Sequence, residues 1–106
     1  MLRVNQGVAE VDAYIWLDAT RTESFLAVPE AYATIPLRGT THHTMALHAY
    51  QQLNLPLNTI LRYDVTVQRT SGGISIATKG NGIRLALPPE HPAFSLFDFL
   101  LKQCGL

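Results

Sequence analysis

The stretch "TILRYDVTVQRTSGGISIATKGNGIRLAL", residues 59–87, decides the fold. Its first part, TILRYDVTVQR, alternates apolar with polar side chains, which is typical of a strand with one buried face. The clusters SGG and GNG separate this part from ISIATK and ISIATK from IRLAL, and such glycine-bearing connections favour tight turns between antiparallel strands. The stretch therefore predicts a three-stranded antiparallel meander.

The residues near the N-terminus predict more strands. Residues 8–18, VAEVDAYIWLD, alternate in the same way and indicate a half-buried strand. TRTES is typical of a turn, and the segments FLAV and AYATIPL, on either side of Pro29, predict a second strand and an interrupted third one. Because Pro29 and Pro36 lack the N–H that a ladder needs, we expect this region at a sheet edge or in an irregular return.

Two helices complete the expected fold. The apolar period becomes helical over residues 40–53, TTHHTMALHAYQQL. The tail HPAFSLFDFLLKQCGL predicts a C-terminal helix, with Ser95 and Asp98 at the spacing of a capping box and Gly105 as a C-terminal cap. Residues 1–106 are thus expected to form a single α+β domain. Along the chain we expect two or three strands, a helix, a three-stranded meander and a C-terminal helix. The strands form a mostly antiparallel sheet, and the helices pack on one of its faces.

The composition excludes several classes of function. Eight Lys and Arg balance eight Asp and Glu without a block of like charge, so broad nucleic-acid binding is not expected. No apolar run is long enough for a membrane span, and the start MLRVNQGVAEVD lacks the apolar core of a secretory signal. The single cysteine, Cys104, excludes an internal disulfide and favours the cytoplasm. SGG and GNG lack the spacing of a phosphate-binding loop, so no cofactor is expected.

The first expected helix carries three histidines. At 100° per residue His42 falls on the apolar stripe, whereas His48 falls on the polar side. Their separation does not let them converge on one ion, so no metal site is expected. The simplest interpretation has Thr40 or Thr41 as the helix cap, His42 at the edge of the core, and His43 and His48 in solvent.

A ligand site is the alternative interpretation of the same region. Free N–H groups at a helix start favour anions, and Thr41, His42 and His43 lie there with Arg38 just upstream. A small molecule could also occupy a pocket between this helix and the sheet, lined by Arg38, His42 and Tyr50.

Asp64 enters two further hypotheses. It could orient His42 or His43 as the base of a small hydrolase. Alternatively, Asp12 on the first strand and Asp64 on the fourth could lie close together and hold a divalent metal for phosphodiester hydrolysis. Cross-strand ion pairs account for the same acids without any function, and we assign no catalytic residue.

The segment TTHHTMALHA resembles the helix start of ribonuclease H-like domains, which also place one acid on the first strand and another on the strand after that helix. In that family the helix carries a carboxylate, which would fall at Ala46 here. The family also continues with a helix where a glycine-turned meander follows Asp64 in this sequence. No activity is carried over from this resemblance.

Apolar surface residues give the leading hypothesis on function. The apolar stripe of the last helix covers about half its circumference, and Phe99 widens it beyond what packing on one sheet requires. The first strand adds large aromatic side chains among carboxylates, a composition typical of protein interfaces. We therefore expect a non-enzymatic protein-binding module that acts as an adaptor, inhibitor or regulator and forms a homodimer. The expected interaction surface consists of Tyr14, Trp16, Phe97, Phe99 and Leu100.

Overall fold

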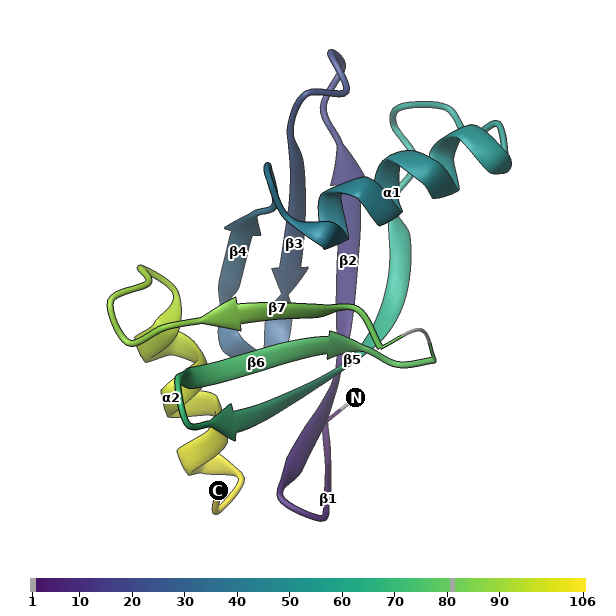
Figure 1. The fold of residues 1–106 in the computed structure, drawn as a ribbon. Coiled ribbons are helices and arrows are strands. Elements are labelled where there is room, and N and C mark those ends of the chain that lie inside the picture. Colours follow the sequence, from purple (N-terminus) through teal and green to yellow (C-terminus); the bar gives the residue numbers. More distant parts are fainter. Residues whose placement is uncertain (1, 81) are drawn as a thin grey trace.

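A computed structural model describes residues 2–80 and 82–106 and confirms the α+β class: seven antiparallel strands form one curled sheet, on which two helices pack (Figure 1). The strands are β1 (Arg3–Asn5), β2 (Val8–Leu17), β3 (Ser24–Val28), β4 (Ala33–Pro36), β5 (Leu61–Thr70), β6 (Gly73–Thr78) and β7 (Arg84–Leu87). The helices are α1 (Thr41–Gln52) and α2 (Phe94–Gln103), and a short 3₁₀ helix, η1 (Pro29–Ala31), joins β3 to β4.

The strand order is β4-β3-β2-β5-β6-β7, with β1 paired to the first part of β2. The expected meander of residues 59–87 is therefore confirmed as β5, β6 and β7. Only Ser71 and Gly72 separate β5 from β6. In the connection from β6 to β7, Gly80 and Gly82 have φ of +101° and +71°, whereas Asn81, the middle residue of the expected GNG turn, lies outside the described residues.

Alternation in the strands creates an inner and an outer face of the sheet. In β2 the odd-numbered residues from Ala9 to Leu17 are buried, and the even-numbered ones are half-buried on the outer face. The sheet curls so far that β6 and β7 cross in front of β2 and β3 (Figure 1). α1 packs on β2, β3 and β7, and α2 packs on β5, β6 and η1, so both helices close the inner face over one hydrophobic core.

The ends of the helices follow the sequence in part. Thr40 is the cap of α1, with its Oγ1 accepting from the His43 N–H at 3.2 Å, as expected. Gly105, at φ +75°, ends α2 while its N–H donates to Lys102 O at 3.0 Å. The expected capping box of Ser95 and Asp98 is wrong, because α2 begins before Ser95 and Asp98 instead forms an ion pair with Arg69 at 2.7 Å.

β1 is the strand that the sequence analysis missed. It pairs with β2 through a two-residue turn in which Gln6 and Gly7 have φ of +52° and +80°.

In the described part of the chain, no helix combines the length and the hydropathy of a membrane-spanning segment.

The expected position of Pro29 and Pro36 is confirmed. Pro29 begins η1, and Pro36 lies in β4, an edge strand. The Leu37 N–H donates to Ser24 O at 2.8 Å, so this pair is hydrogen-bonded across β3 and β4. Because hydrogen-bonded and non-bonded pairs alternate in an antiparallel ladder, the nitrogen of Pro36 faces away from β3.

The opposite edge strand, β7, ends in a similar way. The Thr78 N–H donates to Ile83 O at 2.9 Å, which sets the alternation between β6 and β7. The backbone N–H and C=O groups of Arg84 and Ala86 therefore point away from β6. Pro88 occupies the next position of the chain at which the backbone nitrogen points away from β6. Both ends of the β4-to-β7 strand order therefore present a proline where an outward N–H would otherwise lie.

Candidate functional site

The expected interaction surface is divided by the structure. Phe97 and Leu100 are only 0% and 4% exposed, so their assignment to a surface is wrong. The apolar stripe of α2 is wide because the curled sheet and η1 contact the helix on more than one side, which the pattern alone did not indicate. Phe99 is 61% exposed on the other side of α2, whereas Tyr14 and Trp16 are half-buried on the outer face of the sheet.

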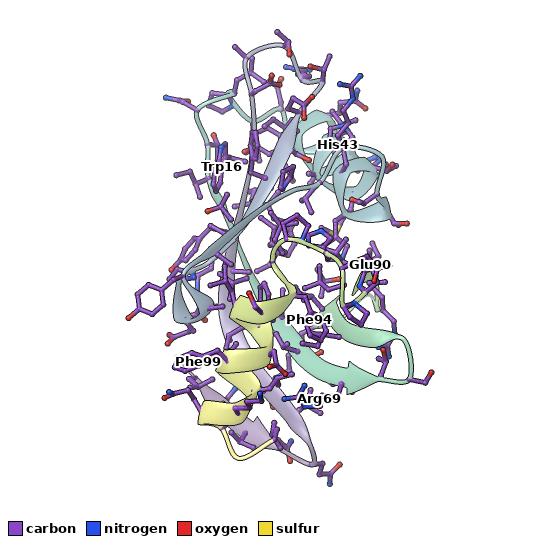
Figure 2. All side chains as sticks on the ribbon, turned by 90° about the vertical axis from the view of Figure 1, so that its left-hand side faces the viewer. Trp16, His43, Arg69, Glu90, Phe94 and Phe99 are labelled. Carbon is purple, nitrogen blue, oxygen red and sulfur yellow. The ribbon has the colours of Figure 1, made fainter. Side chains whose placement is uncertain are left out.

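Phe99 belongs to a larger apolar surface, which we call the α2 patch: Leu2, Tyr32, Leu96 and Phe99. These side chains are 40%, 89%, 40% and 61% exposed, respectively. Leu96 and Phe99 are three residues apart, so they share one side of α2. Figure 2 shows Phe99 on the side of α2 opposite to Arg69, away from the ion pairs of that helix.

Tyr32 is presented to solvent by an unusual backbone conformation. It caps η1 with φ +53°, and its N–H donates to Pro29 O at 3.0 Å. A bulky residue rarely adopts this left-handed region, and such outliers persist where the surrounding structure fixes them, often at functional positions. No local sequence pattern predicts this position, because the ring is exposed through the backbone conformation of the turn.

Two hollows lie beside the α2 patch and share Leu96. The first, of about 360 Å³, is lined by Leu2, Glu30, Ala31, Tyr32, Leu96, Phe99, Leu100 and Gln103. The second, of about 370 Å³, separates β4 from the start of α2 and is lined by Thr34, Ile35, Pro36, His91, Pro92, Ala93 and Leu96. The patch thus combines projecting rings with adjacent depressions, which is the relief that a protein interface needs.

A second apolar surface lies on the outer face around Trp16. The Trp16 ring stacks on Phe25 of β3, with centroids 5.6 Å apart and an interplanar angle of 28°. A hollow of about 240 Å³ opens beside it, lined by Trp16, Leu57, Asn58 and Ile60. Trp16 and Phe99 lie at different ends of the molecule (Figure 2), so the expected surface is in fact two surfaces.

The acidic residues of the outer face are close together, as the metal hypothesis requires. Asp12 and Asp64 are directly opposite each other in the ladder of β2 and β5. However, Nη2 of Arg62 lies 2.6 Å from Asp12 Oδ1 and 3.2 Å from Asp64 Oδ1, so one guanidinium pairs with both carboxylates. Its hydrogen bond to Asp12 raises the pKa of Arg62.

Glu10 repeats this arrangement at the next position of β2. Lys79 Nζ and Arg3 Nη2 lie 2.8 Å and 3.3 Å from Glu10 Oε1, and the hydrogen bond from Lys79 lowers the pKa of this carboxyl group. A hollow of about 250 Å³ over these side chains is lined by Arg3, Glu10, Val11, Asp12, Arg62 and Asp64. It contains its own cations, and residues 2–80 and 82–106 hold no cluster of three potential metal ligands. Cross-strand ion pairing describes this face best.

Replacing Arg62 by glutamine should remove the guanidinium that bridges Asp12 and Asp64, and we expect a small decrease in melting temperature at low salt. The decrease should shrink at about 1 M salt, where the screening length falls to roughly 3 Å. Thermal unfolding of both proteins in a salt series measures it. A stabilised variant, or a difference that grows with salt, would contradict the ion-pair interpretation.

The histidines of α1 form two separate contacts. His42 is completely buried, and its Nε2 lies 3.1 Å from Ile83 O. The expectation that His43 lies in solvent is wrong, because its Nδ1 lies 2.5 Å from Oγ of Ser24, a buried hydroxyl that needs a partner. His48 is exposed, as expected.

The remaining residues of the expected ligand site point to different surroundings. Arg38 forms an ion pair with Glu23 at 3.1 Å, Thr41 is exposed, and the Tyr50 hydroxyl donates to Thr59 O in the core. The hollows described above are the two beside the α2 patch, the one beside Trp16 and the one over the ion pairs of the outer face. No residue of α1 lines any of these four. Asp64 lies on the outer face and α1 on the inner one, so the structure does not bring this acid to the histidines.

Comparisons of the chain with protein-family models, with curated proteins and with solved structures found no match. The function therefore has to be argued from the surfaces and contacts of this chain alone.

Proposed function

We propose that the protein is a non-enzymatic protein-binding module that associates with a second copy of itself through the α2 patch. One observation carries the proposal: Leu2, Tyr32, Leu96 and Phe99, each at least 40% exposed, gather around one side of α2. Single exposed apolar residues are normal on a protein, but a contiguous group of large ones marks an interaction site.

A second copy fits the relief and the charge of this surface. Tyr32 and Phe99 project next to a hollow of about 360 Å³, so a two-fold axis would place the rings of each copy against the hollow of the other. The formal net charge is zero, with eight basic and eight acidic residues, so two copies do not repel each other.

The outer face leaves room for a different protein partner. Tyr14 and Trp16 lie there, and the hollow beside Trp16 is remote from Phe99 (Figure 2). A dimer would present this surface twice and could act as an adaptor, inhibitor or regulator of that partner. The half-buried free thiol of Cys104 is compatible with the cytoplasm as its compartment.

Sedimentation velocity tests the self-association. We expect the protein to dimerise at micromolar concentration and Phe99→Glu to raise the dimer Kd at least roughly 30-fold, equivalent to about 2 kcal/mol, because a carboxylate would be buried in an apolar interface. Thr44→Glu adds the same charge at an exposed position of α1 and should leave the Kd unchanged. Trp16→Ala should leave it unchanged as well, because this ring lies on the other surface.

Two results would contradict the proposal. A wild-type protein that stays monomeric at about 0.5 mM would remove self-association altogether, since interfaces weaker than this are rarely specific. A dimer that is weakened by Trp16→Ala and not by Phe99→Glu would instead assign the interface to the outer face.

A further inference from the structure

The two helices are attached to the sheet by different kinds of contact. α2 buries Phe97, Leu100 and Leu101. α1 buries only His42, Ala46 and Tyr50, which are spaced four residues apart along one side of the helix. Met45 and Leu47 of α1 are only partly buried against the core, so the hydrogen bonds of the two buried rings contribute to the docking of this helix.

His42 makes the polar contact that joins α1 to the meander. It is completely buried, and because a carbonyl can only accept, the imidazole donates its Nε2–H to Ile83 O at 3.1 Å. The same carbonyl accepts from Thr78 N at 2.9 Å, so it also closes the connection between β6 and β7. Nδ1 of His42 has no hydrogen-bond partner among the described residues. The site therefore accommodates a neutral imidazole with one N–H.

We propose that His42 is a pH-sensitive switch that keeps α1 on the inner face of the sheet at neutral pH and releases it in mild acid. Protonation would place a positive charge in the core and add a second N–H, at Nδ1, that has no acceptor. Both changes oppose docking, since an unpaired buried charge and an unsatisfied buried donor are each costly. Release of α1 lets the imidazolium reach water.

The titratable groups around α1 do not compensate that charge. On α1 itself, the Nδ1 of His43 faces the Ser24 hydroxyl, which can either donate or accept and carries no charge. On β2, the side chains that face α1 are apolar: Ala13, Ile15 and Leu17.

The charged groups next to β3 and on β7 are engaged elsewhere. Glu23, next to β3, pairs with Arg38 at 3.1 Å, and Arg84 of β7 donates to Ser75 on the outer face at 3.2 Å. Tyr50, which also lies in the α1 interface, has a pKa raised by burial and stays neutral in acid. Burial lowers the pKa of His42, against a smaller raising effect of its hydrogen bond to Ile83.

The direction of the pH effect follows from these contacts. Docked His42 has a pKa below 6.5, the ordinary value that it regains when α1 is released. Docking is therefore fully favourable above about pH 6.5 and weakens as the pH falls from there through the pKa of the docked state. Between about pH 7.4 and pH 5, the ratio of released to docked α1 should rise by at most about 30-fold, the limit set by protonation of the released form alone.

Native-state amide hydrogen exchange at these two pH values tests the proposal, after correction for the intrinsic exchange rates. We expect the protection of α1 amides to fall at pH 5, by at most about 30-fold, while amides of β5 keep theirs. His42→Gln keeps a donor for Ile83 O and should abolish the pH dependence. His48→Gln removes an exposed histidine from the same helix and should leave the pH dependence intact.

Several results would overturn the proposal: equal α1 protection at both pH values, loss of α1 and β5 protection together, or a pH dependence that persists in His42→Gln. If His42→Gln does not fold, an NMR titration of the wild-type imidazoles decides instead. His42 must then titrate below its ordinary value of 6.5, and its titration must coincide with the opening of α1; any other result refutes the switch.

Discussion

Replacing Phe97 by alanine should lower the free energy of unfolding by about 3–5 kcal/mol, the usual loss when a large aromatic side chain is removed from a close-packed core. Phe97 is completely buried between α2 and the sheet, and it is one of three large residues through which this helix reaches the inner face. Urea unfolding followed by circular dichroism measures the change, with an unchanged m-value showing that the unfolded state is not altered.

Phe99→Ala is the matched control, since it removes the same side chain from the same helix two residues later. Phe99 is 61% exposed, so the monomer should lose less than about 1 kcal/mol. Both proteins must be compared below the dimer Kd, because association would add its own stabilisation. Equal losses at the two positions would contradict the burial of Phe97, and with it the packing of α2.

Replacing Gly73 by alanine should cost about 2–4 kcal/mol, from backbone strain together with a steric clash. Gly73 opens β6 with φ +141°, a conformation that residues with a side chain rarely adopt. A Cβ there would lie 2.3 Å from Leu87 O, and this backbone carbonyl cannot move without disturbing the pairing of β6 with β7. Thermal and urea unfolding would report the loss.

The neighbouring glycine provides the control. A Cβ at Gly72 would meet nothing within 4 Å, and its φ is not in the left-handed region. Gly72→Ala should therefore be neutral or stabilise the protein by roughly 0.4–1 kcal/mol, through the reduced freedom of the unfolded chain. If both substitutions had the same effect, the close approach of β6 and β7 at this turn would be refuted.

The strands were predictable because their alternation is long. β2 alternates apolar and polar residues over ten positions. In the meander, two glycine-bearing turns additionally mark where each strand ends. β1 has only three residues, too few for a period, and its turn uses Gln6 at φ +52°, where asparagine or glycine would have been the usual signal. Short strands thus depend on contacts that a local pattern does not contain.

The candidate site was predictable only in its ingredients. Exposed aromatic residues were expected on α2, and Phe99 is one of them, but the sequence could not distinguish it from Phe97, because it does not show that the sheet curls around the helix. Tyr32 was missed, since nothing local predicts its positive φ. The contact between His43 and Ser24 joins residues nineteen positions apart and follows only from the packing of α1 on β3.

The prolines at the edges formed by β4 and β7 disfavour one kind of assembly. An open edge is a template on which another chain can add a strand, the first step of amyloid growth. Here β4 and β7 have only four residues each. Pro36 and Pro88 lack the outward N–H that would donate to the carbonyl of an added strand. The two prolines therefore disfavour strand addition at β4 and β7, and with it the growth of a fibre from these two edges.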